Sequence, residues 1–282
     1  MKIMIAGSTG FVGRNLTEYL KPRYDELYCP KRKELNLVDR GAVESYLAEH
    51  RFDAVIHCGV TLQSVEDNLK MYFNIERCSK HFGKMIVVGS GAEYGLKPGS
   101  SNLKESDFGK NMPTDIYGFS KYVIGKDVEA KHRNIYNLRV FGIYGKYEDY
   151  KHRFISNNIC RVLAGLNISM KRNAVFDYLY VNDFSRILEM FIQKDPAQRS
   201  YNVCAGEGLE LLTLAKLIQD IDGRGIPIDI KEEGIGRVYT GDNTLFLKEF
   251  GDFDFTPPRE AVSELYKWYK DDSGIVLDPA IL

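Results

Sequence analysis

The sequence predicts an α/β protein with a doubly wound parallel sheet and a small C-terminal α/β lobe. Short apolar runs alternate with amphipathic stretches through the first half of the chain. These apolar runs lack strict polar–apolar alternation, as is typical of strands that are covered on both faces. A glycine-rich turn directly follows the first run. Together these three observations favour parallel strands joined by helical crossovers.

The order of elements in the first half follows from the apolar runs. The expected strands are Lys2–Ala6, Glu26–Cys29, Ala54–Cys58, Met85–Ser90 and Ile135–Phe141. The expected helices between them are Val12–Lys21, Ala42–His50, Val65–Phe82 and Tyr117–His132. Asp39 stands just before the second helix, where a carboxylate caps free backbone N–H groups.

After Phe141 the regular rhythm breaks. The expected elements are a helix at Phe154–Ala164, a strand at Tyr178–Val181, a helix running on to Ile192, a strand at Tyr201–Val203, and helices near Thr213–Ile221 and Pro258–Lys270. The segment Gly223–Gly236 is rich in glycine, and we interpret it as a loop.

Composition excludes several classes of function. The 38 Lys and Arg residues balance 39 Asp and Glu residues, so no net charge attracts nucleic acid or an anionic membrane. No apolar run approaches the ~20 residues that span a bilayer, and the N-terminus lacks the pattern of a signal peptide. The five cysteines and five histidines are scattered. We therefore expect a cytoplasmic protein with free thiols, no metal site, and neither nucleic-acid nor membrane partners.

The glycine-rich turn Gly7-Ser8-Thr9-Gly10-Phe11-Val12-Gly13 predicts a dinucleotide site. The first glycine permits a tight turn, and the second allows the backbone to approach a pyrophosphate. The third lets helix and strand pack closely, while the helix N-terminus favours the phosphate charge. Its position between the first strand and the first helix supports this interpretation over a plain turn.

The end of the second strand bears on the choice between NAD and NADP. An acidic residue there binds a free ribose 2′-hydroxyl, whereas a basic one accepts a 2′-phosphate. This chain places Lys31, Arg32 and Lys33 there and no acid at the strand end. NADP(H) is therefore favoured, with Arg32 as the main phosphate ligand, and NAD(H) remains the alternative.

Tyr117 and Lys121 lie four residues apart, on one face of the expected helix. Ser90 falls at the carboxyl end of the fourth strand, where open α/β sheets bind ligands. An ammonium group favours phenolate, so Lys121 would lower the high intrinsic pKa of Tyr117. Tyr117 could then exchange a proton with an alkoxide, and Ser90 could hydrogen-bond the reacting oxygen.

These motifs resemble the extended short-chain dehydrogenases/reductases of the NAD(P)-dependent epimerase/dehydratase family over essentially the whole chain. The matching segments are the glycine turn, Phe52–Cys58, Asn74, Ser90 with Tyr94-Gly95, Tyr117 with Lys121, Arg139–Gly145, Asp177–Asp183 and the stretch from Arg237. The resemblance implies a Rossmann domain at residues 1–145, with a return segment at about 174–204. It implies a substrate-binding lobe at residues 146–173 and 205–282, and a nucleotide-sugar substrate.

The resemblance also implies roles for individual residues. The catalytic residues would be Ser90, Tyr117 and Lys121. The cofactor would contact Gly7, Thr9, Gly10, Phe11, Val12, Gly13, Lys31, Arg32, Asn36, Leu37, Cys58, Gly59 and Lys121. The substrate would contact Glu93, Tyr94, Tyr144, Asn157 and Arg237. A homodimer would form through a four-helix contact of Val65–Phe82 and Tyr117–His132.

Within the family, the segment Lys31–Asp39 resembles NADPH-using 4-keto-6-deoxysugar reductases such as dTDP-4-dehydrorhamnose reductase and GDP-fucose synthase. The 4,6-dehydratases carry an Asp-Glu pair directly after the catalytic Ser or Thr, where this chain has Gly91-Ala92. GDP-fucose synthase has a Cys where Ala92 stands. We therefore expect an NADP(H)-dependent reductase of the 4-keto group of a nucleotide-linked deoxysugar. An NAD-dependent 4-epimerase and a non-catalytic dinucleotide-binding sensor or scaffold are the alternatives.

Overall fold

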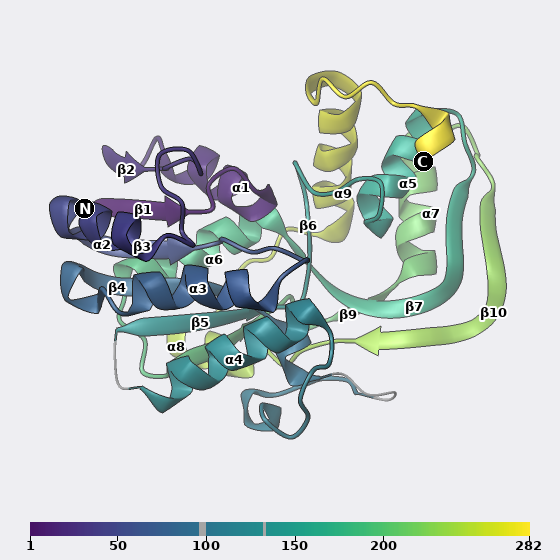
Figure 1. The fold of residues 1–282 in the computed structure, drawn as a ribbon. Helices are drawn as coiled ribbons and strands as arrows, with labels where there is room; N and C mark the ends of the chain where they lie inside the picture. The colour runs from purple at the N-terminus through teal and green to yellow at the C-terminus, as the bar shows by residue number, and fades with distance from the viewer. Residues whose placement is uncertain (96–99, 132–133) are drawn as a thin grey trace.

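A six-stranded parallel sheet forms the larger part of the computed structural model, which describes residues 1–95, 100–131 and 134–282 (Figure 1). The strands lie in the order β2-β1-β3-β4-β5-β8. Their bounds are β1 Lys2–Ala6, β2 Glu26–Tyr28, β3 Phe52–His57, β4 Phe82–Ser90, β5 Ile135–Val140 and β8 Ser200–Val203. Each neighbouring pair is parallel, so all the carboxyl ends meet at one edge, and the predicted fold class is confirmed.

Helices cover both faces of this sheet, which explains the continuous apolar strands. Ile3 and Ile5 pack with the helices α1 (Phe11–Leu20) and α6 (Val181–Gln193) on one face. Met4 and Ala6 point to the opposite face. That face packs against α2 (Arg40–His50), α3 (Val65–Glu76) and α4 (Ile116–Ala130). Since successive strand residues face opposite sides, both sets must be apolar.

The helices that cover this sheet begin close to the positions that the sequence predicts, but α3 ends earlier than expected. Asp39 caps α2, because its carboxylate accepts the Ala42 N–H at 3.0 Å. The expected helix Val65–Phe82 stops at Glu76, and a 3₁₀ turn at Ser79–His81 leads into β4. The predicted end of the fourth helix, His132, lies outside the described residues.

A second sheet forms the C-terminal lobe. Its strands run in the order β10-β7-β6, and β9 pairs antiparallel with β7. Their bounds are β6 Gly142–Tyr144, β7 Ile168–Tyr180, β9 Gly208–Glu210 and β10 Ile228–Tyr239. The lobe helices α5 (Phe154–Leu163), α7 (Leu211–Asp222) and α9 (Pro258–Lys267) share one apolar core. One further helix, α8 (Thr244–Phe250), packs beside β8 and belongs to the core of the first sheet.

The interpretation of Gly223–Gly236 as a loop holds for residues 223–227 and is wrong from Ile228 onward. Residues from Ile228 onward form the long edge strand β10, which pairs in parallel with β7. The pairing register shifts between Glu232 and Ile235 and again between Ile235 and Val238. Gly234 has a φ of 83°, which suits a glycine at such an irregularity. Gly234 and Gly236 therefore lie at irregularities within a strand, whereas Gly223 and Gly225 precede it.

None of the helices in the described ranges has the length and apolar character needed to cross a bilayer. The lobe stands at the carboxyl edge of the first sheet, with β6 entering the space between them (Figure 1). This edge is where open parallel sheets bind ligands.

Candidate active site

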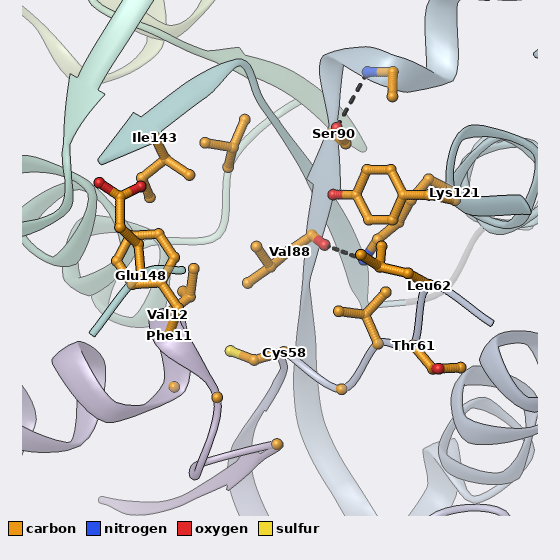
Figure 2. A pocket seen from close by; sticks show the side chains of 18 of the residues that line it. Phe11, Val12, Cys58, Thr61, Leu62, Val88, Ser90, Lys121, Ile143 and Glu148 are labelled. Carbon is orange, nitrogen blue, oxygen red and sulfur yellow. Dashed lines mark hydrogen bonds between the residues drawn. The ribbon is translucent and has the colours of Figure 1, made fainter. Parts of the chain in front are cut away.

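A pocket of about 1140 Å³ lies between the first sheet and the lobe (Figure 2). The first sheet contributes the ends of β1, β3 and β4, and the lobe contributes Phe176, Tyr178 and Arg237. Figure 2 shows Ser90 and Lys121 on one side, with Phe11, Ile143 and Glu148 facing them from the other. The volume suits a dinucleotide together with part of a second ligand.

The glycine turn has the geometry that a dinucleotide requires. Gly7 has a φ of 85°, and a Cβ on it would lie 2.6 Å from Gly59 N. A Cβ on Gly13 would collide with Gly7 O and would lie 2.8 Å from Ser8 Cα. A Cβ on Gly10 would meet only Gly7 O, at 3.6 Å. Gly10 lines the pocket, so the space beside its Cα is open to a ligand. The cradle therefore fits a pyrophosphate over Gly10 and the N-terminus of α1.

The basic turn after β2 presents one of its cations to the pocket. Arg32 lines it, together with Leu35, Asn36 and Leu37. Lys31 does not; its backbone N–H donates to the Glu34 carboxylate at 2.7 Å. Asn74 on α3 donates to Leu37 O at 2.9 Å and so holds this segment against the sheet. The predicted cofactor residues thus lie along the pocket, except Lys31.

Ser90, Tyr117 and Lys121 line the pocket together. Lys121 Nζ donates to the Val88 carbonyl at 2.6 Å and lies 5.9 Å from the centre of the Tyr117 ring. Burial lowers the pKa of Lys121, and the negative charge of Glu93 opposes that effect. Burial raises the pKa of Tyr117, and the Ser90 hydroxyl opposes this shift. Asp115 caps α4 by accepting the Gly118 N–H at 2.8 Å, which fixes the start of the helix that carries both residues.

Glu93 lies behind the pocket instead of lining it. The side chain is fully buried, and its carboxylate accepts hydrogen bonds from Arg139 Nε at 2.8 Å and Asn137 Nδ2 at 2.9 Å. It also accepts the Ser90 N–H at 2.9 Å. The carboxylate oxygens of Glu93 face the core, so Glu93 does not contact a substrate in the pocket as the resemblance implied. Its role in the structure is to hold the backbone of Ser90.

The other predicted substrate residues divide into two groups. Arg237 is exposed on the pocket rim, and Tyr144 lines the pocket while nearly enclosed. Tyr94 is buried and donates to Asn202 at 2.6 Å, so it does not reach the pocket. Asn157 donates to Lys151 O at 3.2 Å on the outer side of α5 and does not line the pocket. Arg153, just before α5, lines the pocket in its place.

Several lining residues were not singled out as site residues in the sequence. Phe176, Tyr178 and Tyr239 form an aromatic wall on the lobe side, with Phe176 between the other two rings at 5.6 and 6.0 Å. Glu148 is buried and accepts a hydrogen bond from the Ser156 hydroxyl, and burial raises its pKa to about 7. The run of aromatics ending β7 was a visible signal, but its partner strand β10 was interpreted as a loop. Among the described residues, no group of three or more His, Cys, Asp or Glu side chains is arranged to hold a metal ion.

Comparison with known proteins identifies the family. The model of the NAD dependent epimerase/dehydratase family matches residues 3–204, which is most of the chain. The chain belongs to this family. It is therefore an NAD(P)-dependent enzyme of a family that modifies nucleotide sugars. This confirms the resemblance seen in the glycine turn and in the Tyr117–Lys121 pair.

Individual members of this family are similar along nearly the full chain but at low identity. GDP-L-colitose synthase of Yersinia pseudotuberculosis is 21% identical, with 89% of this chain and 92% of that protein aligned. The dTDP-glucose 4,6-dehydratase of Bacillus anthracis with NAD superposes with a TM-score of 0.82 at 16% identity, covering 96% and 97% of the two chains. The GDP-mannoheptose C4 reductase of Campylobacter jejuni with NADP gives 0.81 at 18%, covering 95% and 98%. These family structures share the fold, and they differ in both reaction and cofactor.

Proposed function

We propose that this enzyme is an NADP(H)-dependent reductase of the 4-keto group of a nucleotide-linked deoxysugar. The observation that carries the proposal is the convergence of Ser90, Tyr117 and Lys121 on one pocket, with no acidic side chain directly after Ser90. Without an acid–base pair at Gly91 and Ala92, elimination of water has no evident catalyst there. The groups present suit proton exchange at a single oxygen.

The residues of the chain divide the chemistry as follows. A bound NADPH would supply the hydride. Tyr117 donates its phenol proton to the oxygen that becomes the new hydroxyl, and Lys121 favours the phenolate left behind. Ser90 donates a hydrogen bond to the same oxygen as negative charge develops on it. Lys121 is buried and Tyr117 is half-buried at the pocket wall, where an interaction between their charges is stronger than in bulk water.

Consumption of NADPH tests the reaction directly. The purified protein is mixed with NADPH and with 4-keto-6-deoxyhexoses linked to UDP, GDP, CDP or dTDP, and absorbance at the nicotinamide band is followed. We expect turnover with at least one nucleotide. Tyr117→Phe should lose about 10²-fold or more of that turnover while still binding NADPH. Absence of NADPH oxidation across the whole panel would refute the reductase.

Two other results would assign a different function. The 4-epimerase uses the same trio with tightly held NAD, so NAD that copurifies with the protein would favour it. A sensor or scaffold needs no proton exchange. If the Tyr117→Phe variant restores the phenotype of a strain that lacks the gene for this protein as well as the wild type does, that class would be favoured. Tyr117 and Lys121 both line the pocket, which supports a catalytic role for them over this alternative.

We propose NADP(H) as the preferred cofactor because Arg32 lines the pocket and no acidic side chain ends β2. Arg32→Ala should weaken NADP⁺ binding at least tenfold with little effect on NAD⁺. Lys33→Ala is the matched control, since Lys33 is exposed and does not line the pocket. Titration calorimetry with both cofactors decides it; an Arg32→Ala protein with the full NADP⁺ preference would exclude this assignment.

We further propose a homodimer through α3 and α4. These helices lie side by side, and Tyr72 on α3 donates to Asp127 on α4 at 2.9 Å. Phe119, Tyr122 and Val123 on α4 are only partly buried, which leaves apolar surface for a partner. Light scattering should give the mass of two chains, and Val123→Glu should give that of one.

A further inference from the structure

Tyr239 belongs to the lobe, yet its hydroxyl lies against the first sheet beside Ser90. It is the last residue of β10. A Cβ added to Gly91 would lie 2.5 Å from Tyr239 Oη, so the hydroxyl packs on the backbone of the residue that follows Ser90. The same Cβ would lie 2.9 Å from the ring of Phe141, which directly follows β5. Tyr239 thus occupies the space that a side chain at position 91 would need.

Three features hold the Tyr239 ring in this place. Its centroid lies 5.1 Å from that of Phe141 and 6.0 Å from that of Phe176, its pairing partner on β7. The Arg237 guanidinium lies 5.5 Å from the ring centre. The register shift just before Val238 turns the end of β10, and bulges near active sites commonly re-aim a side chain in this way.

The hydroxyl of Ser90 has a limited set of hydrogen-bonding positions. A hydroxyl oxygen accepts two hydrogen bonds and donates one. The Ala92 N–H already donates to Ser90 Oγ at 3.1 Å. If the Tyr239 hydroxyl donates to the second acceptor position, the single proton of Ser90 must point toward the pocket, where Tyr117 lies.

The charges around the two phenols decide which one keeps its proton. Burial, followed by the negative charge of an ionised Tyr117, raises the pKa of Tyr239, while the Ser90 hydroxyl and Arg237 lower it. An ionised Tyr117 therefore favours the protonated form of Tyr239, which is the form that can donate a hydrogen bond. Several elements bring charged groups near Tyr117: Glu93, Arg153 and Asp115, together with Lys121, whose Nζ lies 5.9 Å from the ring centre.

We propose that Tyr239 is a positioning residue that donates a hydrogen bond to Ser90 Oγ and so turns the Ser90 proton toward Tyr117 and the reacting oxygen. This inference rests on the proposed reductase activity. It extends that proposal by assigning a residue of the lobe, Tyr239, a role in positioning the catalytic Ser90. It also gives Gly91 a function, since any side chain there would displace the Tyr239 hydroxyl. An ordered Ser90 proton stabilises the phenolate of Tyr117 and the alkoxide of the product.

Tyr239→Phe tests this, because it keeps the ring and removes only the hydroxyl. Loss of one such hydrogen bond should lower kcat about tenfold, with KM for NADPH unchanged. The alkaline limb of the pH profile should move to higher pH, because the phenolate of Tyr117 is less stabilised. Gly91→Ala should reproduce the loss by displacing the hydroxyl. Tyr266→Phe is the matched control, since it removes a lobe hydroxyl that donates to Asp222 at 2.8 Å, far from Ser90. It should keep wild-type kcat and pH profile.

A measurement without substrate separates this inference from the reaction. In protein labelled with ¹³Cζ-tyrosine and saturated with NADP⁺, the resonance of Tyr117 is identified by its loss in Tyr117→Phe. Its pKa should rise in Tyr239→Phe and stay unchanged in Tyr266→Phe. If that rise occurs in a protein that reduces no 4-keto sugar, the positioning role stands and the proposed reaction fails. A Tyr117 titration and a kcat that Tyr239→Phe leaves unchanged would overturn the inference.

Discussion

Glu93 and Arg139 place a full ion pair in the protein interior. The Arg139 Nε and the Glu93 carboxylate are 2.8 Å apart, and neither side chain is exposed. Arg139 also pairs with Glu129 at 2.7 Å and lies 3.9 Å over the Phe108 ring. Burial raises the pKa of Glu93, and the charge of Arg139 opposes that shift. Each buried charge thus depends strongly on the other for its stabilisation.

Removing one partner of this pair should be costly. Arg139→Met leaves the buried carboxylate without its cation and should lower the free energy of unfolding by about 3–5 kcal/mol. Glu93→Leu combined with Arg139→Met removes both charges and should recover a large part of the loss. Urea unfolding of the wild type, the two single variants and the double variant measures this. Strictly additive effects would show that the pair is not coupled.

His57 makes the stability of the protein depend on pH. It is fully buried at the end of β3, and neither ring nitrogen has a partner in the described ranges. Burial lowers its pKa to about 3 from an ordinary value of 6.5. Below pH 6.5 the unfolded chain takes up a proton that the folded chain does not. Stability contributed by the neutral ring is therefore lost as the pH falls from 6.5 toward 3, by up to about 1.4 kcal/mol per pH unit.

Comparison with His57→Leu isolates this contribution. Burial raises the pKa of Glu148 to about 7 and that of Asp177 to about 6. The contribution of these two carboxyl groups to the stability of the protein therefore changes in the opposite direction, and it is lost as the pH rises. Both groups are present in wild type and variant, so their effects cancel in the difference. The wild type should lose more stability than His57→Leu between pH 7 and pH 5 in urea unfolding. Equal slopes would show that His57 is protonated in the folded state.

At the scale of elements, the β1–α1 turn separates folding from ligand binding. Gly13 is where α1 packs on the turn, whereas Gly10 faces the pocket. The turn at Gly7 requires a positive φ, which L side chains rarely adopt. Gly7 and Gly13 therefore determine the conformation of this turn, and Gly10 is the position at which a ligand can approach its backbone.

The two alanine variants should have different consequences. Gly13→Ala forces the helix away from backbone atoms and should cost several kcal/mol of stability, as overpacking does. Gly10→Ala meets only one atom at 3.6 Å and should leave stability within about 0.5 kcal/mol. It should nevertheless weaken NADP⁺ binding, because a methyl group would stand where the pyrophosphate approaches. Thermal unfolding and calorimetric titration distinguish them; equal stability loss in both would refute this division.

At the scale of the whole molecule, one pocket draws on both sheets. The residues that we propose to bind the cofactor belong to the part of the chain around the first sheet, while Arg153, Phe176 and Arg237 belong to the lobe. Figure 1 shows β6 between the first sheet and the lobe; β6 leads into the lobe and β7 returns from it to α6, so the two parts are joined by more than one strand. A ligand seated across them stabilises the folded chain as a unit.

This predicts that NADP⁺ stabilises the entire protein. At a hundred times its Kd the cofactor should add about 2.7 kcal/mol to the free energy of unfolding. The unfolding transition should stay single and should shift with the logarithm of cofactor concentration. Gly10→Ala is the control that folds and should respond only at much higher NADP⁺. Two separated transitions, with the later one insensitive to NADP⁺, would show that the lobe folds independently of the cofactor.

The local part of this protein could be predicted from its sequence. The glycine turn, the cap at Asp39 and the Tyr117–Lys121 pair depend on backbone conformation and helical spacing, which a few neighbouring residues determine. The apolar strands indicated a sheet covered on both faces, and the fold class followed. Arg32 was a local prediction as well, since its position follows from the end of β2.

Only the tertiary structure decided which side chains face the pocket. Glu93 follows Ser90 closely, yet it turns inward because Arg139 and Asn137 supply donors from β5. Tyr239 is distant in sequence, yet pairing of β10 with β7 brings its hydroxyl to Gly91. Glycines in β10 suggested a loop because the bulges they permit depend on a partner strand. Side-chain direction at such positions is set by long-range packing, which local sequence does not encode.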